Sequence, residues 1–242
     1  MAITVVGIGP GRESAMTQDA LDAIASAQVV VGYNVYVDLV RHLCDGKEVL
    51  STGMMKEVER CKLALDASLA GKNVAFVCSG DPGIYGMAGI MMEVAEDHPE
   101  TEIRVIPGVT SACASAALLG APLIHDFAVI SLSDLLTPWE KIEKRVRLAA
   151  EADFVICIYN PRSKKRHDYL EKAVGWILEH RTPDTPIGYV KNAGRDGEES
   201  HLCTLENVPF EEIDMFTTLI VGNSQTKVIN GRMVTPRGYR GV

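Results

Sequence analysis

The residues best suited to chemistry lie in three glycine-rich turns, each of which follows a short apolar run. The richest turn, residues 79–89, holds four glycines, one proline and a single charged side chain, Asp81. Two further turns lie at residues 7–11 and 107–111. Glycines let a backbone turn sharply and approach a ligand closely. The turns therefore predict a cradle for a compact polar ligand at the carboxyl end of a sheet.

Other kinds of catalytic site find little support in the sequence. It has no Gly-x-Ser-x-Gly elbow and no P-loop, and its six cysteines include no Cys-x-x-Cys pair. Three of the cysteines lie inside or beside apolar runs, and we expect these to be reduced core thiols. The six histidines lack the spacing of metal ligands, so we expect no metal site. Methyl transfer from a sulfonium fits better, because positioning alone contributes roughly 7–11 kcal/mol.

Composition limits the partners of the protein. The chain has 242 residues, 47% of them hydrophobic, and a net charge of -8, which argues against nucleic acid and anionic membranes. There is no basic leader and no apolar run of about 18 residues, so we expect a cytoplasmic protein without a membrane span.

The turns are positioned by alternating strands and helices. Strands are expected at 3–6, 29–32, 74–78 and 103–106, and helices from 17 and at 35–43, 54–70 and 87–94, which predicts parallel strands. A proline-containing linker at 121–126 separates domains 1–120 and 121–242. The second half has expected strands at 127–132, 154–159, 187–190, 219–223 and 227–229 and helices at 139–150 and 168–180. This less regular order favours a mixed sheet and a ligand cleft between two lobes.

Four motifs follow one another along the chain: Gly7-Ile8-Gly9-Pro10-Gly11, SGDPGIYGM at 79–87, PGVTS at 107–111 and NAGR at 192–195. Together and in this order they resemble the signatures of the tetrapyrrole methylases. Further blocks resemble the branch of the family that methylates carbon 17 of the macrocycle and contracts the ring in cobalamin synthesis: HDF at 125–127, ISLSDLLTPW at 130–139, YNPRS at 159–163 and TPRGY at 235–239. The resemblance covers nearly the whole chain.

The resemblance implies a two-lobed α/β fold of the class III S-adenosyl-L-methionine methyltransferases, with parallel and mixed sheets, flanking helices and usually a homodimer. It implies S-adenosyl-L-methionine as methyl donor and S-adenosyl-L-homocysteine as product. Residue by residue, the implied cofactor contacts are Pro10, Ser79, Gly80, Asp81, Ile84, Thr110, Ser111, Tyr159, Asn192, Ala193 and Thr218.

The implied substrate is a tetrapyrrole with several acetate and propionate groups, with or without cobalt. Its carboxylates need cations, and the candidates are Arg162, Lys164, Lys165, Arg166, Lys191 and Arg195. Ring contraction also needs proton transfer. The acid–base candidates, which we expect to cluster where the second lobe begins, are His125, Asp126, Ser131 and Asp134. For His125, a structural role as a linker anchor is an equal alternative.

Three other hypotheses remain at this point. The first is that a protein of the same fold methylates another macrocycle position or a non-tetrapyrrole acceptor. The turn at 7–11 also suits a nucleotide-binding oxidoreductase that uses NAD(P), for which Asp38 is the nearest acid to the second strand. A carrier would bind the macrocycle without catalysis.

Overall fold

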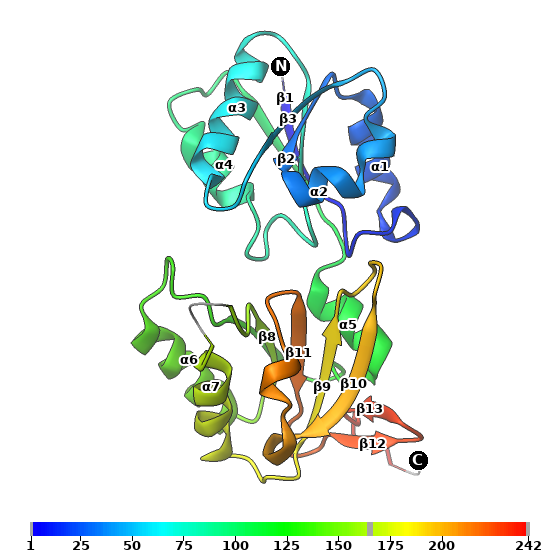
Figure 1. Ribbon diagram of the computed structural model, residues 1–242, viewed down its shortest axis with the longest axis vertical. Helices are drawn as coiled ribbons and strands as arrows, with labels where there is room; N and C mark the ends of the chain where they lie inside the picture. Colours follow the sequence, from blue (N-terminus) through cyan, green and yellow to red (C-terminus); the bar gives the residue numbers. More distant parts are fainter. Residues whose placement is uncertain (1, 164–166, 241–242) are drawn as a thin grey trace. The chain divides into compact units, whose positions relative to one another are not determined.

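The computed structural model describes residues 2–163 and 167–240. The chain folds as two compact units, Met1–Ser111 and Ala112–Val242, each with its own five-stranded sheet (Figure 1). Helices flank both sheets, so the expected α/β class is confirmed. Within the described ranges, no helix is long and apolar enough to cross a membrane.

The first sheet is entirely parallel, in the order β3-β2-β4-β1-β5. Its strands are β1 (Ala2–Gly7), β2 (Val29–Tyr33), β3 (Glu48–Thr52), β4 (Val74–Cys78) and β5 (Glu102–Ile106). Four of them match the expected strands. The edge strand β3 was not predicted, because its sequence EVLST is short, half polar and only partly buried. Parallel pairing brings all five carboxyl ends to one edge of the sheet.

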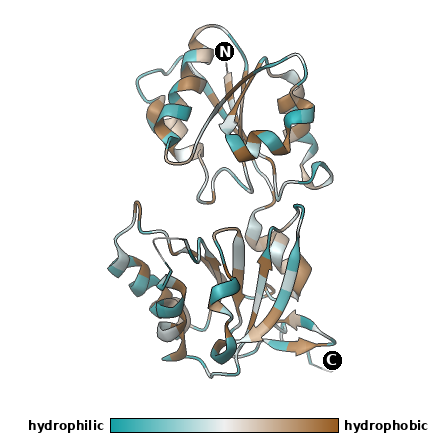
Figure 2. Ribbon diagram, viewed as in Figure 1, coloured by the Kyte–Doolittle hydropathy of each residue, from teal (hydrophilic) through white to brown (hydrophobic). Residues whose placement is uncertain are grey.

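Four helices cover the two faces of the first sheet: α1 (Gln18–Ser26), α2 (Asn34–Leu39), α3 (Glu57–Leu69) and α4 (Ala88–Val94). Alternate strand residues face opposite sides. Val29 and Val31 pack in the cluster that contains α3 and α4, whereas Val30 packs with α1 and α2. Hydrophobic and hydrophilic residues alternate around the helices accordingly (Figure 2). Helix α3 begins later than expected, since Met55 has a positive φ of 63°.

The second sheet is mixed, as expected, in the order β10-β9-β11-β8-β7. Its strands are β7 (Phe127–Ser131), β8 (Val155–Tyr159), β9 (Pro186–Lys191), β10 (Glu199–Thr204) and β11 (Thr217–Val221). Strands β7 and β8 are parallel and the remaining pairs antiparallel. Helices α6 (Trp139–Glu151) and α7 (Tyr169–Leu178) cover one face. Strand β10 was missed because its sequence ESHLCT is polar.

Helix α5 (Ser111–Leu119) covers the other face of the second sheet. Its Ala112, Ala116 and Leu119 pack against residues of β8, β9 and β11. The boundary between the units therefore precedes α5, rather than following it as the domain limits 1–120 and 121–242 assumed. The presumed linker contributes to a small sheet of β6 (Gly120–Ala121), β12 (Lys227–Ile229) and β13 (Arg232–Val234).

The packing of α5 on the second sheet can be tested at Gly188 of β9. A Cβ atom there would lie 2.7 Å from Leu119 Cδ2, so Gly188→Ala should lower the free energy of unfolding by about 1–3 kcal/mol. The matched control is Gly175→Ala on the exposed face of α7, where a Cβ meets nothing within 4 Å. This control should stabilise by about 0.5–1 kcal/mol, because alanine favours a helix interior. Urea denaturation measures both, and equal effects would contradict the packing described.

Candidate functional site

Three loops of the first unit meet through their backbones at the carboxyl edge of the sheet. Gly9 and Gly80 exchange two hydrogen bonds, with N···O distances of 3.2 and 2.8 Å. A Cβ atom on Gly7 would lie 2.6 Å from Gly108 N and 2.7 Å from Gly80 O. A Cβ atom on Gly108 would collide with Gly80 O. Since real Cβ atoms essentially never approach within 3.0 Å, these positions accept no other residue without a backbone shift.

The carboxylate of Asp81 links two of these loops. Oδ1 accepts a hydrogen bond from Gly83 N at 2.8 Å, and Oδ2 accepts one from Gly108 N at 3.1 Å. Hydrogen bonds from amides to an ionised carboxylate are stronger than neutral ones. Asp81 therefore fixes the path of its own loop and its distance from the loop after β5.

The expected cofactor residues of the first unit come together on these loops. Pro10 directly follows Gly9, and Ser79 directly precedes Gly80, so both residues flank the bridge between these two glycines. Gly80 packs beside the backbones of Thr110 and Ser111, since a Cβ on Gly80 would lie 3.6 Å from Thr110 Cα. Ile84 is 39% exposed on the same loop as Asp81. The first-unit set thus shares one edge of the sheet.

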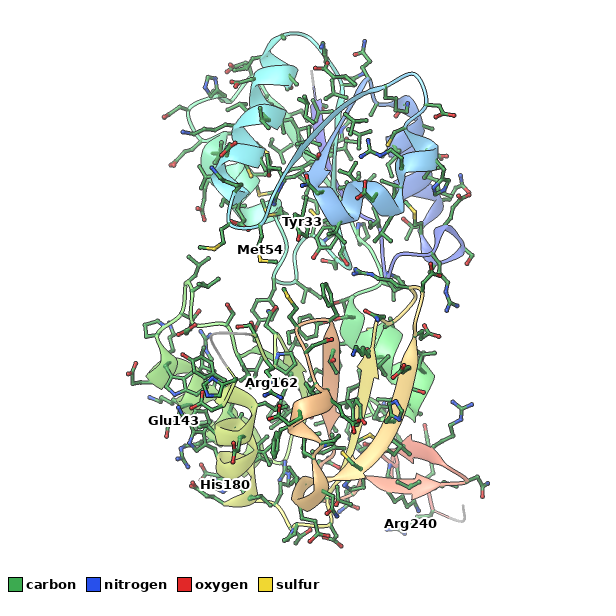
Figure 3. All side chains as sticks on the ribbon, viewed as in Figure 1. Tyr33, Met54, Glu143, Arg162, His180 and Arg240 are labelled. Carbon is green, nitrogen blue, oxygen red and sulfur yellow. The ribbon has the colours of Figure 1, made fainter. Side chains whose placement is uncertain are left out.

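A cavity of about 230 Å³ lies beside the glycine loops and was missed in the sequence. Its lining includes Tyr33, Tyr36, Met54, Arg60, Ser79 and Tyr85. Two of these, Tyr33 and Met54, are labelled in Figure 3. Arg60 lies among the charged residues 56–62, yet its side chain is buried, unlike those of its charged neighbours. Its spacing was the overlooked signal: Arg60, Ala64 and Ser68 repeat every four residues on the buried face of α3.

The cavity also touches Cys78, whose thiol is not activated. Burial raises the pKa of Cys78 to about 12, and that of Cys157 in the second unit likewise to about 12. Cys44 and Cys61 are buried too, and each of the six cysteines is free of disulfide bonds. Cys78 and Cys157, which lie in apolar runs, are thus buried free thiols, as expected. In the described ranges, no three His, Cys, Asp or Glu side chains are grouped to hold a metal ion.

In the second unit, most of the remaining candidates share one edge of the sheet. Tyr159 ends β8 and Lys191 ends β9, and the next residue, Asn192, donates from its backbone N to Phe216 O just before β11, at 3.2 Å. Ala193 follows in the same turn, and Thr218 is buried in the first part of β11. Tyr159 also has a structural contact, because its hydroxyl accepts a hydrogen bond from Ala112 N at 2.8 Å and so caps α5.

The four acid–base candidates do not form the expected cluster. Ser131 ends β7, and its Oγ accepts a hydrogen bond from Asn160 Nδ2 at 2.9 Å. Asp134 lies beyond that end and accepts one from Tyr169 Oη at 2.7 Å. The exposed His125 and Asp126 precede the opposite end of β7. A strand rises about 3.3 Å per residue, so Asp126 and Ser131 are about 16 Å apart.

Two of the expected substrate cations, Arg162 and Lys191, pair with carboxylates within the protein. Arg162, which is labelled in Figure 3, donates from Nη2 to both carboxylate oxygens of Glu211, at 2.8 and 2.9 Å, and from Nη1 to Phe210 O. Lys191 Nζ lies 3.2 Å from Asp214 Oδ2. Arg195 lies in the turn after β9, where its backbone N donates to Asn192 O at 2.9 Å. Lys164, Lys165 and Arg166 lie outside the described residues.

Glycine loops at the carboxyl ends of a parallel sheet, joined by a carboxylate and bordered by an aromatic pocket, define an α/β protein that binds a small polar ligand by its backbone. The comparisons with known proteins specify this class. The sequence profile of the Tetrapyrrole (Corrin/Porphyrin) Methylases matches residues 2–209.

Individual relatives align with this chain over almost its full length. A probable cobalt-factor III C(17)-methyltransferase of Salmonella typhimurium is 51% identical, with 98% of this chain and 99% of the relative covered. A precorrin-3B C(17)-methyltransferase of Sinorhizobium is 39% identical, with 98% and 96% covered. The crystal structure of the methyltransferase CobJ superposes with a TM-score of 0.91 at 38% identity, covering 97% of this chain and 99% of that one. The chain belongs to the tetrapyrrole (corrin/porphyrin) methylases.

Because the Asp81 carboxylate links two loops, its removal should lower the stability of the folded protein. Asp81→Ala leaves two loop amides without their acceptor and should lower the free energy of unfolding by about 1–3 kcal/mol. Asp66→Ala is the matched control, because Asp66 is an exposed acid in the last turn of α3 and should change stability by less than about 0.5 kcal/mol. Thermal or urea unfolding measures both. Similar effects of the two substitutions would show that the carboxylate does not hold the loops.

The raised thiol pKa values predict slow chemical modification. With a pKa of about 12, about one Cys78 thiol in 10⁴ is ionised at pH 8, and the thiolate is the reactive form. Treatment of the native protein with a disulfide reagent at pH 8, followed by peptide mapping, should leave Cys78 and Cys157 unmodified. Both should react at once in guanidinium chloride. Rapid labelling of Cys78 in the native protein would contradict its burial.

Proposed function

We propose that this chain is a C(17)-methyltransferase of cobalamin biosynthesis. It transfers a methyl group from S-adenosyl-L-methionine to carbon 17 of cobalt-factor III or precorrin-3B, with contraction of the macrocycle. The observation that carries the proposal is the 51% identity, across 98% of the chain, to a relative named for this reaction. The branch-specific blocks at 125–139, 159–163 and 235–239 support it further.

The glycine loops suit this methyl donor. Their close backbone packing excludes side chains from the contact of Gly7, Gly80 and Gly108, and Asp81, the charged residue of loop 79–89, is already bonded to two amides. When bound, S-adenosyl-L-methionine supplies an activated methyl group on a positively charged sulfur. Pro10, Ser79, Gly80, Ile84, Thr110 and Ser111 would hold it by backbone and short side-chain contacts. Tyr159, Asn192, Ala193 and Thr218 stay predicted contacts of the second unit.

The chain's main task in such a reaction is to position the reactants and exclude water, because the methyl group is already activated. Ring contraction adds a need for proton transfer. Of the four candidates we retain Ser131 and Asp134, because both lie at the sheet edge that carries Tyr159 and Asn192. His125 and Asp126 lie at the other end of β7, and we assign them no proton-transfer role.

The nicotinamide-dependent alternative loses its support. The turn at 7–11 leads into a 3-10 turn, Glu13–Ala15, before α1 begins, whereas a dinucleotide-binding fingerprint opens its helix directly. The family match also spans residues 2–209 and therefore both units. The cobalt content of the substrate, a homodimer and a cytoplasmic location stay predictions.

Two measurements test the proposed function. Calorimetry should show micromolar binding of S-adenosyl-L-homocysteine, weakened at least tenfold by Asp81→Ala through loss of loop order. Separate anaerobic incubations with cobalt-factor III and precorrin-3B should give a product that is heavier by one methyl group in mass spectrometry. If S-adenosyl-L-homocysteine does not bind at high micromolar concentration, the cofactor assignment is refuted. If NMR locates the new methyl group on another carbon, the assignment of carbon 17 is refuted.

A further inference from the structure

The guanidinium of Arg60 is a buried positive charge without a carboxylate partner among the described residues. The residue is 4% exposed at the cavity of the first unit. Its Nε donates to Thr52 Oγ1 at 3.0 Å, its Nη2 donates to Gly53 O at 2.9 Å, and its Nη1 reaches Met87 Sδ at 3.9 Å. All three acceptors are neutral. Buried charges in proteins are normally paired with an opposite charge, so the guanidinium of Arg60 lacks the counter-ion that a buried charge normally has.

Arg60 has N–H donors beyond those it uses within the protein, and it lines a cavity. A guanidinium has five N–H donors, and three contacts leave two. A carboxylate would accept both and neutralise the charge. The cavity of about 230 Å³ lies at the carboxyl ends of β2 and β4, beside the loop that carries Ser79 and Asp81.

The cavity also offers aromatic surface. The Arg60 guanidinium lies 5.6 Å from the ring centre of Tyr33, and Tyr33 meets Tyr36 edge to face at 5.1 Å. Tyr85 is 58% exposed and held at a positive φ of 53° at the rim. Glu57 lines the same cavity with an exposed carboxylate, which opposes binding of an anion. The balance still favours an anion, since the arginine is buried whereas the glutamate is solvated and therefore screened.

Size restricts what the cavity can hold. Sites for drug-sized ligands enclose roughly 300–1,000 Å³, so about 230 Å³ is too small for a tetrapyrrole ring but adequate for one carboxylate arm. We propose that this cavity is a subsite that anchors one acetate or propionate group of the tetrapyrrole on Arg60, with the tyrosines against the adjoining ring edge. The identity of the ligand rests on the proposed function, whereas the anion site itself does not.

The test compares Arg60→Gln with Arg104→Gln in the full chain. Arg104 is an exposed arginine of β5 paired with Glu102, and it serves as the matched control. The probes are cobalt-factor III in turnover and uroporphyrin, a stable fluorescent tetrapyrrole with acetate and propionate arms, in binding. Arg60→Gln should raise the uroporphyrin Kd and the KM for cobalt-factor III about 10- to 100-fold, the range for losing a hydrogen-bonded charge. The Kd of S-adenosyl-L-homocysteine should change less than about threefold.

A second variant guards against misfolding of Arg60→Gln. Glu57→Gln removes the opposing exposed carboxylate and should tighten uroporphyrin binding about two- to fivefold, an effect that added salt should reduce. The subsite is refuted if folded Arg60→Gln binds both tetrapyrroles like the wild type, or if Glu57→Gln does not tighten binding. Uroporphyrin binding that depends on Arg60, without methylation of either cobalt-factor III or precorrin-3B, would support the anion subsite and refute the proposed function instead.

Discussion

Backbone contact among Gly7, Gly80 and Gly108 is the constraint on which the first unit depends. Three loops that belong to β1, β4 and β5 converge so closely that a single Cβ atom at Gly7 or Gly108 would collide with the neighbouring backbone. The carboxylate of Asp81 maintains this arrangement from the side by bonding Gly83 and Gly108. Because side chains are excluded here, backbone groups form the surface where the three loops meet. The same edge of the sheet places the cavity around Arg60 next to that surface.

The second unit reaches a comparable edge by a different route. Its sheet is mixed, yet β7, β8 and β9 all end at the same side, where Ser131, Tyr159 and Asn192 lie. Polar side chains rather than glycines organise this edge: Asn160 bonds Ser131, Tyr169 bonds Asp134, and Arg162 pairs with Glu211. Cations that the sequence offered for substrate carboxylates thus stabilise the unit itself in at least two cases, Arg162 and Lys191.

The sequence predicted those features that local patterns determine. Buried strands such as Val74–Cys78 are continuous apolar runs, and glycine turns at their ends are readable directly. Polar strands at the sheet margins, Glu48–Thr52 and Glu199–Thr204, carry no such pattern and were missed. Helix α5 was assigned to the wrong unit, because its alanines and serines say nothing about which sheet they cover.

The site residues likewise divide into those that local patterns placed and those that depend on tertiary contacts. Motif glycines and Asp81 could be placed on common loops, since each follows a strand of one parallel sheet. Proximity in sequence misled us for His125, Asp126, Ser131 and Asp134, because an extended strand separates residues that are near neighbours in the chain. The ionic partners of Arg162 and Lys191 arise from tertiary contacts over longer sequence separations, which no local pattern reveals. The burial of Arg60, by contrast, was readable from its four-residue spacing with Ala64 and Ser68 and was overlooked.

The position of β1 in its sheet has a consequence for the order of folding. Strand β1 is the first to be synthesised, but both of its neighbours, β4 and β5, follow much later in the chain. Contacts between distant segments form slowly, because the intervening loop must first close. A nascent chain that ends before Gly108 has the residues of β1 to β5, yet it lacks the third loop and the Gly108 amide that donates a hydrogen bond to Asp81 Oδ2. The glycine cradle is therefore completed among the last parts of the first unit to be assembled, after most of its hydrophobic core has been synthesised.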